Sequence, residues 1–123
     1  MGNFKEGFYQ RTYQYAFDVL RFLKTLQKDS AVHVLENQLI RSATSVAANI
    51  LEAKAASSKR DYINFYTHAL KSANESTLWL NLIRDCLQLK SNECERLLQE
   101  TIEIGKILGA SILTMKGQRK IKS

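Results

Sequence analysis

The sequence predicts an all-α protein, folded as an antiparallel up-down-up-down four-helix bundle. The chain of 123 residues contains no proline and only five glycines, which argues against loop-rich β architectures. Four segments repeat apolar residues at steps of three and four, the period of a helix face. The short polar breaks between these segments make consecutive helices antiparallel. Since 45% of the residues are apolar, one core can form, and we expect a single domain over residues 1–123.

The first predicted helix runs from about Tyr9 to Gln27. Its apolar residues recur at helical steps and predict a buried stripe. The stripe comprises Tyr13, Ala16, Phe17, Leu20, Leu23 and Leu26. A polar break follows, in which Asp29 or Ser30 can cap the next helix by accepting a hydrogen bond from a backbone N–H.

The second predicted helix runs from about Val32 to Ala56 and carries two apolar stripes. The first is a near-heptad seam, formed by Val32, Leu35, Leu39, Ala43, Val46, Ile50 and Ala53. The second stripe is shorter and consists of Ile40, Ala47 and Leu51. A helix with two stripes is expected to be packed on more than one side.

The third predicted helix runs from Lys59 to about Leu87, and its 29 residues span about 44 Å at 1.5 Å per residue. Ser58 is the expected N-cap, with Asp61 in the place of the usual glutamate of a capping box. The predicted stripe comprises Tyr62, Phe65, Ala69, Ser72, Ser76, Leu80, Ile83 and Leu87.

The fourth predicted helix follows Ser91, which we expect to cap it. Glu93 and Glu95 lie in the first turn, where the helix dipole favours negative charge. The stripe continues through Cys94, Leu97, Thr101, Ile104, Leu108, Ser111 and Met115. Gly117 is expected to end the helix, and residues 116–123 to form a flexible basic tail.

Basic residues outnumber acidic ones by 18 to 12, and the surplus is greatest near the two ends of the chain. In an antiparallel bundle, the starts of the first and third helices lie beside the ends of the second and fourth. Cations are therefore expected to gather at one pole. They are Lys5, Arg11, Lys59, Arg60, Lys116, Arg119, Lys120 and Lys122. Such a pole suits the binding of phosphate backbones. Binding is expected to be without sequence preference, because no base-reading motif accompanies the cations. The alternative is that the surplus of positive charge only keeps the protein in solution.

A set of polar residues shares one face of the second predicted helix, because the residues are spaced by four, four and three. A second polar patch, which includes Ser76, lies on the third predicted helix. The set comprises Arg41, Ser45, Asn49 and Glu52 on the second helix, with Ser72 and Glu75 on the third. One interpretation is a groove for a ligand or partner. We favour the other, a buried polar network that fixes the register of the helices.

The sequence offers no constellation typical of an enzyme. His33 and His68 are the only histidines, and neither has metal ligands at helical spacing. Cys86 and Cys94 are expected on the apolar sides of their helices, where cysteines are inert. We therefore expect no catalytic residues, no metal and no cofactor. No apolar run is long enough to cross a membrane or resembles a signal peptide, so a cytoplasmic protein with reduced cysteines is expected.

The densest motif of the chain runs from Leu39 to Ala53 and continues on the third predicted helix. The continuation comprises Ser58, Asp61, Tyr62, Phe65, Ala69, Ser72 and Glu75. Together these residues resemble the bacterial four-helix-bundle proteins encoded in intervening sequences of 23S ribosomal RNA genes. The family usually has proline where this chain has Ala47 or Ala48.

The resemblance implies an antiparallel four-helix bundle, and related proteins of this kind assemble as pentamers. A related branch serves as the accessory protein of diversity-generating retroelements, which binds reverse transcriptase and nucleic acid through a basic surface. The biochemical role of most members is unsettled, and the resemblance brings no catalytic residues.

Two functional hypotheses follow. The first is a non-enzymatic homo-oligomeric bundle, a pentamer by resemblance, that binds RNA or a nucleoprotein partner through its basic pole. The alternative is a protein–protein interaction scaffold with no nucleic-acid role. It rests on aromatic residues expected at the surface, which would suit a subunit interface. These residues are Phe4, Phe8, Tyr9, Tyr15 and Trp79.

Overall fold

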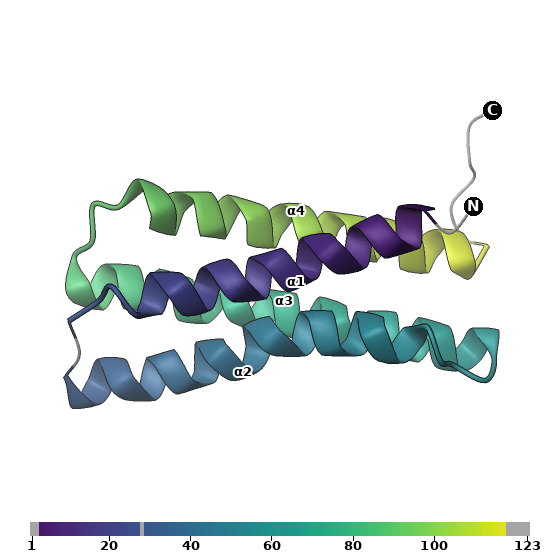
Figure 1. Ribbon diagram of the computed structural model, residues 1–123, viewed down its shortest axis with the longest axis horizontal. Coiled ribbons are helices and arrows are strands. Elements are labelled where there is room, and N and C mark those ends of the chain that lie inside the picture. Colours follow the sequence, from purple (N-terminus) through teal and green to yellow (C-terminus); the bar gives the residue numbers. More distant parts are fainter. Residues whose placement is uncertain (1–2, 28, 118–123) are drawn as a thin grey trace.

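The computed structural model describes residues 3–27 and 29–117, and in this part of the chain it contains helices and no strand. The helices are α1 (Asn3–Leu23), α2 (Ser30–Ala53), α3 (Lys59–Leu87) and α4 (Asn92–Met115). They lie along one axis, with the α2–α3 turn at one end and the other two turns at the opposite end (Figure 1). The predicted up-down-up-down four-helix bundle is therefore confirmed.

The helix starts follow from the capping side chains. The Asp29 carboxylate accepts a hydrogen bond from the Val32 backbone N–H at 2.9 Å, and Ser58 and Ser91 cap α3 and α4 in the same way. These caps are as predicted. The Asp61 carboxylate accepts a hydrogen bond from the Ser57 hydroxyl at 2.7 Å, which holds the turn that precedes α3.

The structure corrects the bounds of α1 and α2. Helix α1 begins at Asn3, before the predicted Tyr9, and ends at Leu23. Beyond Leu23 the backbone tightens, because the Thr25 N–H and the Thr25 hydroxyl both donate to the Phe22 carbonyl, at 3.0 and 2.7 Å. Helix α2 ends at Ala53, three residues before the predicted end.

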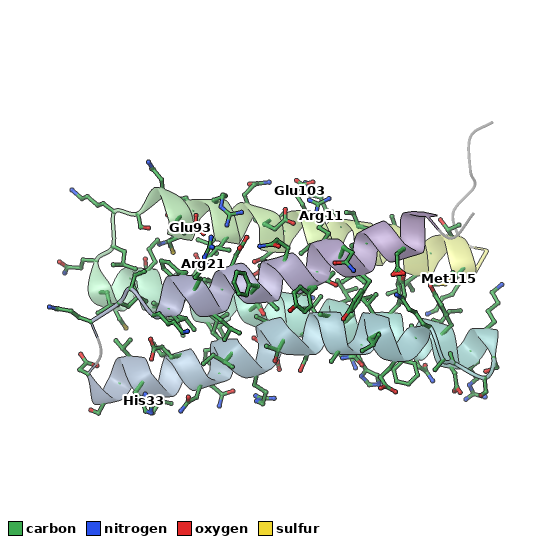
Figure 2. The ribbon with its side chains drawn as sticks, viewed as in Figure 1. Arg11, Arg21, His33, Glu93, Glu103 and Met115 are labelled. Atoms are coloured by element: carbon green, nitrogen blue, oxygen red, sulfur yellow. The ribbon has the colours of Figure 1, made fainter. Side chains whose placement is uncertain are left out.

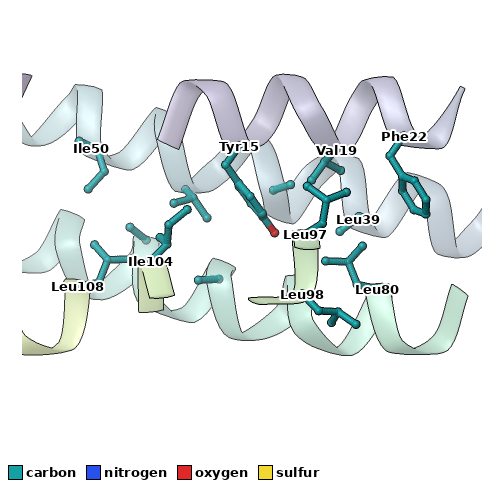
Figure 3. Packing of buried hydrophobic residues seen from close by; sticks show 14 of the residues in the cluster. Tyr15, Val19, Phe22, Leu39, Ile50, Leu80, Leu97, Leu98, Ile104 and Leu108 are labelled. Atoms are coloured by element: carbon teal, nitrogen blue, oxygen red, sulfur yellow. The ribbon is translucent and has the colours of Figure 1, made fainter. Parts of the chain in front are cut away.

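Apolar side chains make up most of the core, and Figure 3 shows Tyr15 pointing into it from α1. The largest fully buried apolar side chains come from all four helices: Tyr15, Val19, Val32, Leu39, Val46, Leu80, Ile83, Leu97, Ile104 and Leu108. The seams predicted for α2 and α4 are largely confirmed. Leu51, from the second predicted stripe of α2, is instead 49% exposed.

Four buried hydroxyl groups, one from each helix, meet within this core. The Tyr15 hydroxyl lies 2.6 Å from Thr101 Oγ1, and Ser42 Oγ lies 2.8 Å from Ser76 Oγ. Burial raises the pKa of the Tyr15 hydroxyl. These residues, Tyr15, Ser42, Ser76 and Thr101, form a cluster that we call the hydroxyl cluster.

The stripe predicted for α1 is wrong in part. Tyr13 is 55% exposed and Phe17 is 46% exposed. The predicted Ala16 and Leu23 are buried. The rest of the buried face is spaced by four, three, four and three residues, and comprises Phe8, Thr12, Tyr15, Val19 and Phe22. Thr12 tolerates burial because its hydroxyl donates to the Tyr9 carbonyl at 2.8 Å.

The set of aromatic residues expected at the surface needs a matching correction. Phe8 and Tyr15 are buried, while Tyr9 and Trp79 are partly buried against the core. The side chain of Phe4 lies outside the described residues. Of the two cysteines, Cys94 is buried as predicted, but Cys86 is exposed because it lies outside the buried stripe of α3.

Replacing Tyr15 by phenylalanine removes one hydroxyl from the hydroxyl cluster and keeps the ring in the core. We expect Tyr15→Phe to lower the free energy of unfolding by about 1–2 kcal/mol, because buried partners lose a hydrogen bond. Tyr13→Phe is the matched control on the exposed face of α1, with an expected change within about 0.5 kcal/mol. Urea denaturation followed by circular dichroism measures both. Equal effects of the two substitutions would contradict a structural role for the cluster.

Candidate nucleic-acid interface

Three exposed cations lie at the end of the bundle that holds the α2–α3 turn. Lys59 and Arg60 begin α3 directly after its N-cap, and Lys116 is the C-cap residue of α4. All three are exposed, and none forms an ion pair with a described carboxylate. We call the end defined by Lys59, Arg60 and Lys116 the basic pole.

The structure does not bring Arg11 into the basic pole. Arg11 lies midway along α1 (Figure 2), and its guanidinium donates to both carboxylate oxygens of Glu100 on α4, at 2.7 and 2.8 Å. The hydrogen bond to Glu100 raises the pKa of Arg11. Since a paired charge offers less to an outside anion, Arg11 serves the contact between α1 and α4.

The remaining predicted cations are only partly described. Lys5 lies in the first turn of α1, but its side chain is outside the described residues. Arg119, Lys120 and Lys122 lie wholly outside the described residues, and follow Gly117 in the sequence. Lys54, close to the basic pole, is engaged: its ammonium lies 2.9 Å from Glu6 Oε2 and 4.5 Å from the centre of the Tyr9 ring.

The opposite end of the bundle carries arginines that are paired and lysines that are not. The Arg96 guanidinium donates to Glu93 at 2.7 Å and to Asp18 at 3.0 Å. The Arg84 guanidinium lies 2.9 Å from Asp85 and 3.6 Å from Glu95. Hydrogen bonding to Arg96 lowers the pKa of Glu93, although partial burial opposes the effect. Lys24 and Lys90 at this end are exposed and pair with no described carboxylate. The contrast between the two ends therefore lies in the paired arginines, Arg84 and Arg96, which the basic pole lacks.

The six polar residues predicted to form a network do not form a buried network across the two helices. Arg41, Glu52 and Glu75 are exposed. Ser45 donates to the Arg41 carbonyl at 2.7 Å, and Asn49 donates to the Ser45 carbonyl at 2.8 Å, so these bonds run along α2. A polar side chain on a helix can donate a hydrogen bond to the backbone carbonyl four residues earlier in the same helix.

The buried polar contact between α2 and α3 comes instead from Ser42 and Ser76. Ser76 also donates to the carbonyl of Ser72, which is how Ser72 joins this contact. The groove interpretation of the exposed polar face stays a prediction.

A cavity of about 730 Å³ opens beside the basic pole, between the α2–α3 turn, the start of α3 and the end of α4. Its lining comprises Ala56, Ser57, Ser58, Lys59, Tyr62, Tyr66, Ile107, Ala110, Ser111, Thr114 and Met115. The rings of Tyr62 and Tyr66 stack with their centres 4.9 Å apart, and the Tyr62 hydroxyl donates to the Tyr66 hydroxyl at 3.2 Å. Burial raises the pKa of Tyr66. Sequence reasoning missed this cavity.

The described residues contain no group of three or more histidine, cysteine or acidic side chains that could hold a metal ion. His33 Nδ1 lies 3.9 Å from Glu36 Oε1 on the same helix. In the part of the chain that the structure describes, no helix combines the length and the apolar character needed to cross a membrane.

Comparison with known proteins identifies the family. Residues 5–110 match the family model described as 23S rRNA-intervening sequence protein. A crystal structure of a protein with unknown function from the S23 ribosomal protein family, from Bacteroides thetaiotaomicron, is 32% identical to this chain, with a TM-score of 0.78. The match covers 85% of this chain and 97% of that one. No functionally curated protein matches the chain. The chain belongs to the 23S rRNA-intervening sequence protein family.

Proposed function

We propose that this chain is a non-enzymatic, single-domain bundle of the cytoplasm that binds RNA, alone or within a nucleoprotein partner, through the basic pole. The observation that carries the proposal is the set of three exposed cations, Lys59, Arg60 and Lys116, that pair with no described carboxylate. At the opposite end Arg84 and Arg96 are held by acidic neighbours. An anionic polymer therefore meets three unpaired positive charges at the basic pole.

The placement of Lys59 and Arg60 strengthens the proposal. Both lie in the first turn of α3, where the helix dipole is positive and disfavours cations. A phosphate group near these residues would relieve that repulsion and interact with the same end of the dipole. Because phosphates are common to all sequences, we expect binding without strong sequence preference.

We further propose that the protein acts as a homo-oligomer, for which the resemblance implies five subunits. The exposed side chains of Tyr13 and Phe17 on α1, together with Leu51 on α2, support this proposal. Aromatic side chains are enriched at subunit interfaces. An oligomer would present several basic poles at once and so raise the avidity for a long RNA.

The same exposed residues favour a second candidate function, a protein–protein interaction scaffold with no nucleic-acid role. In this case Tyr13 and Phe17 would bind a partner protein, and the basic pole would serve solubility alone. The resemblance also implies a specific nucleoprotein partner, the reverse transcriptase of a diversity-generating retroelement with its RNA. RNA binding by the isolated protein separates the first function from the scaffold.

Neutralising the basic pole should weaken RNA binding and its dependence on salt. We expect the triple variant Lys59→Gln, Arg60→Gln, Lys116→Gln to bind single-stranded RNA more weakly. The slope of log K against log salt should become shallower by about 2, since each phosphate contact on a single strand contributes about 0.7. Filter binding over a series of salt concentrations measures this slope.

The control variant removes the same charge elsewhere, through Lys24→Gln, Lys71→Gln and Lys90→Gln. These lysines are exposed and lie away from the basic pole. We expect the control to retain most of the affinity and salt dependence. Equal losses in the two variants would show that net charge alone, and not the basic pole, attracts RNA. No binding by the unmodified protein at low salt would favour the scaffold.

Placing a charge on the exposed face of α1 should weaken self-association. We expect Phe17→Glu to shift the protein from an oligomer toward a monomer, because an unpaired carboxylate buried at an interface is costly. Ile102→Glu is the control on α4, where the replaced side chain is 43% exposed. Sedimentation velocity measures both. A monomeric unmodified protein would contradict the proposed oligomer.

A further inference from the structure

We infer that the cavity beside the basic pole receives one unstacked base of a single-stranded RNA, while Lys59, Arg60 and Lys116 contact the neighbouring phosphates. This inference rests on the proposed function and specifies it, because it names the conformation of the RNA and the part of the nucleotide that enters the protein. Four observations support it: the size of the cavity, its aromatic wall, its hydroxyl groups and its position.

The size of the cavity fits a nucleoside. At about 730 Å³ it falls within the range of about 300–1,000 Å³ that is usual for small-molecule sites. Most of its lining is apolar, including Ile107, Ala110 and Met115 on α4. A base placed against such a wall loses contact with water on the face that it turns toward the wall, which favours stacking over solvation.

The aromatic wall is built for stacking. Tyr62 lies one helical turn before Tyr66, and their rings are inclined by only 23°. Tyr66 is buried, with its ring centre 6.4 Å from that of Phe8 on α1, so it braces Tyr62 from the core side. Tyr62 is partly exposed and lines the cavity. Proteins that bind single-stranded RNA commonly stack bases on aromatic rings presented in this way.

Residues with hydroxyl groups also line the cavity. Ser111 and Thr114 line it from α4, and Tyr62 and Tyr66 line it from α3. Since a hydroxyl both donates and accepts hydrogen bonds, the side chains of Ser111 and Thr114 can satisfy the polar edge of any base. They therefore favour a base over a purely apolar group, without choosing between bases.

Position joins the cavity to the cations. Lys59 belongs to the cavity lining and to the basic pole, and Met115, which lines the cavity, is followed directly by Lys116. A base in the cavity would thus have its own phosphates beside the cations. An uncharged apolar partner would fill the cavity but leave these cations without partners, so the charge favours a nucleotide.

The experiment compares two labelled 12-nucleotide strands with the same number of phosphates, one of intact RNA and one in which every base is removed. Fluorescence anisotropy of the full-length protein measures both affinities. We expect the intact strand to bind about tenfold more tightly, the order of effect of one stacked base. The variant Ala110→Trp, which fills the cavity from α4, should abolish this difference and leave the affinity for the abasic strand unchanged.

Leu113→Trp is the matched control, because Leu113 lies on the same helix, is 44% exposed and is not part of the cavity lining. It should retain the tenfold preference. Thr114→Trp fills the cavity from an exposed position and replaces Ala110→Trp if thermal melting shows that Ala110→Trp unfolds the protein. We expect Tyr62→Phe to keep the preference and Tyr62→Leu to lose it, because only the ring is needed.

The outcomes separate the two proposals. Equal affinity of the unmodified protein for both strands would overturn the base-binding cavity and leave phosphate binding by the basic pole intact. A preference that survives both cavity-filling variants would also overturn it, as would a preference lost equally in Leu113→Trp. Failure to bind either strand would overturn both proposals together.

Discussion

The arrangement of this bundle depends on the hydroxyl cluster of Tyr15, Ser42, Ser76 and Thr101, in which each helix supplies one member. Thr101 donates its proton to the Leu97 carbonyl at 2.7 Å, so the Tyr15 hydroxyl must donate to Thr101. Apolar side chains alone would tolerate a shift of one helix along another, since one buried leucine resembles the next. A shifted helix would leave buried hydroxyl groups without partners, which costs more than the hydrogen bonds contribute when they are made. The cluster therefore selects one register.

That register decides what meets at the basic pole. The antiparallel order places the start of α3 and the end of α4 at the same end of the bundle, and the register sets their level along its axis. Lys59 and Lys116 are thereby brought to one end, although 56 residues separate them in the sequence. The same alignment sets the small side chains of α4 opposite the tyrosines of α3, and the space left between them is the cavity. A void of this kind remains where small residues face large ones and no third helix fills the space between them.

Much of the fold could be predicted from periodicity and capping residues, because both act over a few residues. Ser58 and Ser91 cap their helices as expected. The α2 seam could be predicted because all of its members are apolar. The α1 stripe could not, because Thr12 occupies a buried position and Tyr13 and Phe17 are exposed. The pairing of Arg11 with Glu100 joins residues 89 positions apart, and no local pattern reports it. The cavity likewise requires knowing which faces of α3 and α4 oppose each other.

The cations that begin α3 are easier to explain by an external partner than by the fold. Asp61 and Ser57 already stabilise this helix start, and a positive side chain there opposes the dipole. Lysines at helix C-termini would serve solubility equally well, because the dipole favours positive charge there. Lys116, the C-cap residue of α4, occupies such a position. Arg84 and Arg96 at the opposite end have acidic partners, whereas Lys59 and Arg60 pair with no described carboxylate. Leaving Lys59 and Arg60 unpaired at the least favourable helix position maintains a standing repulsion, which a bound phosphate would remove. The repulsion at this helix start and the proposed binding therefore have the same electrostatic origin.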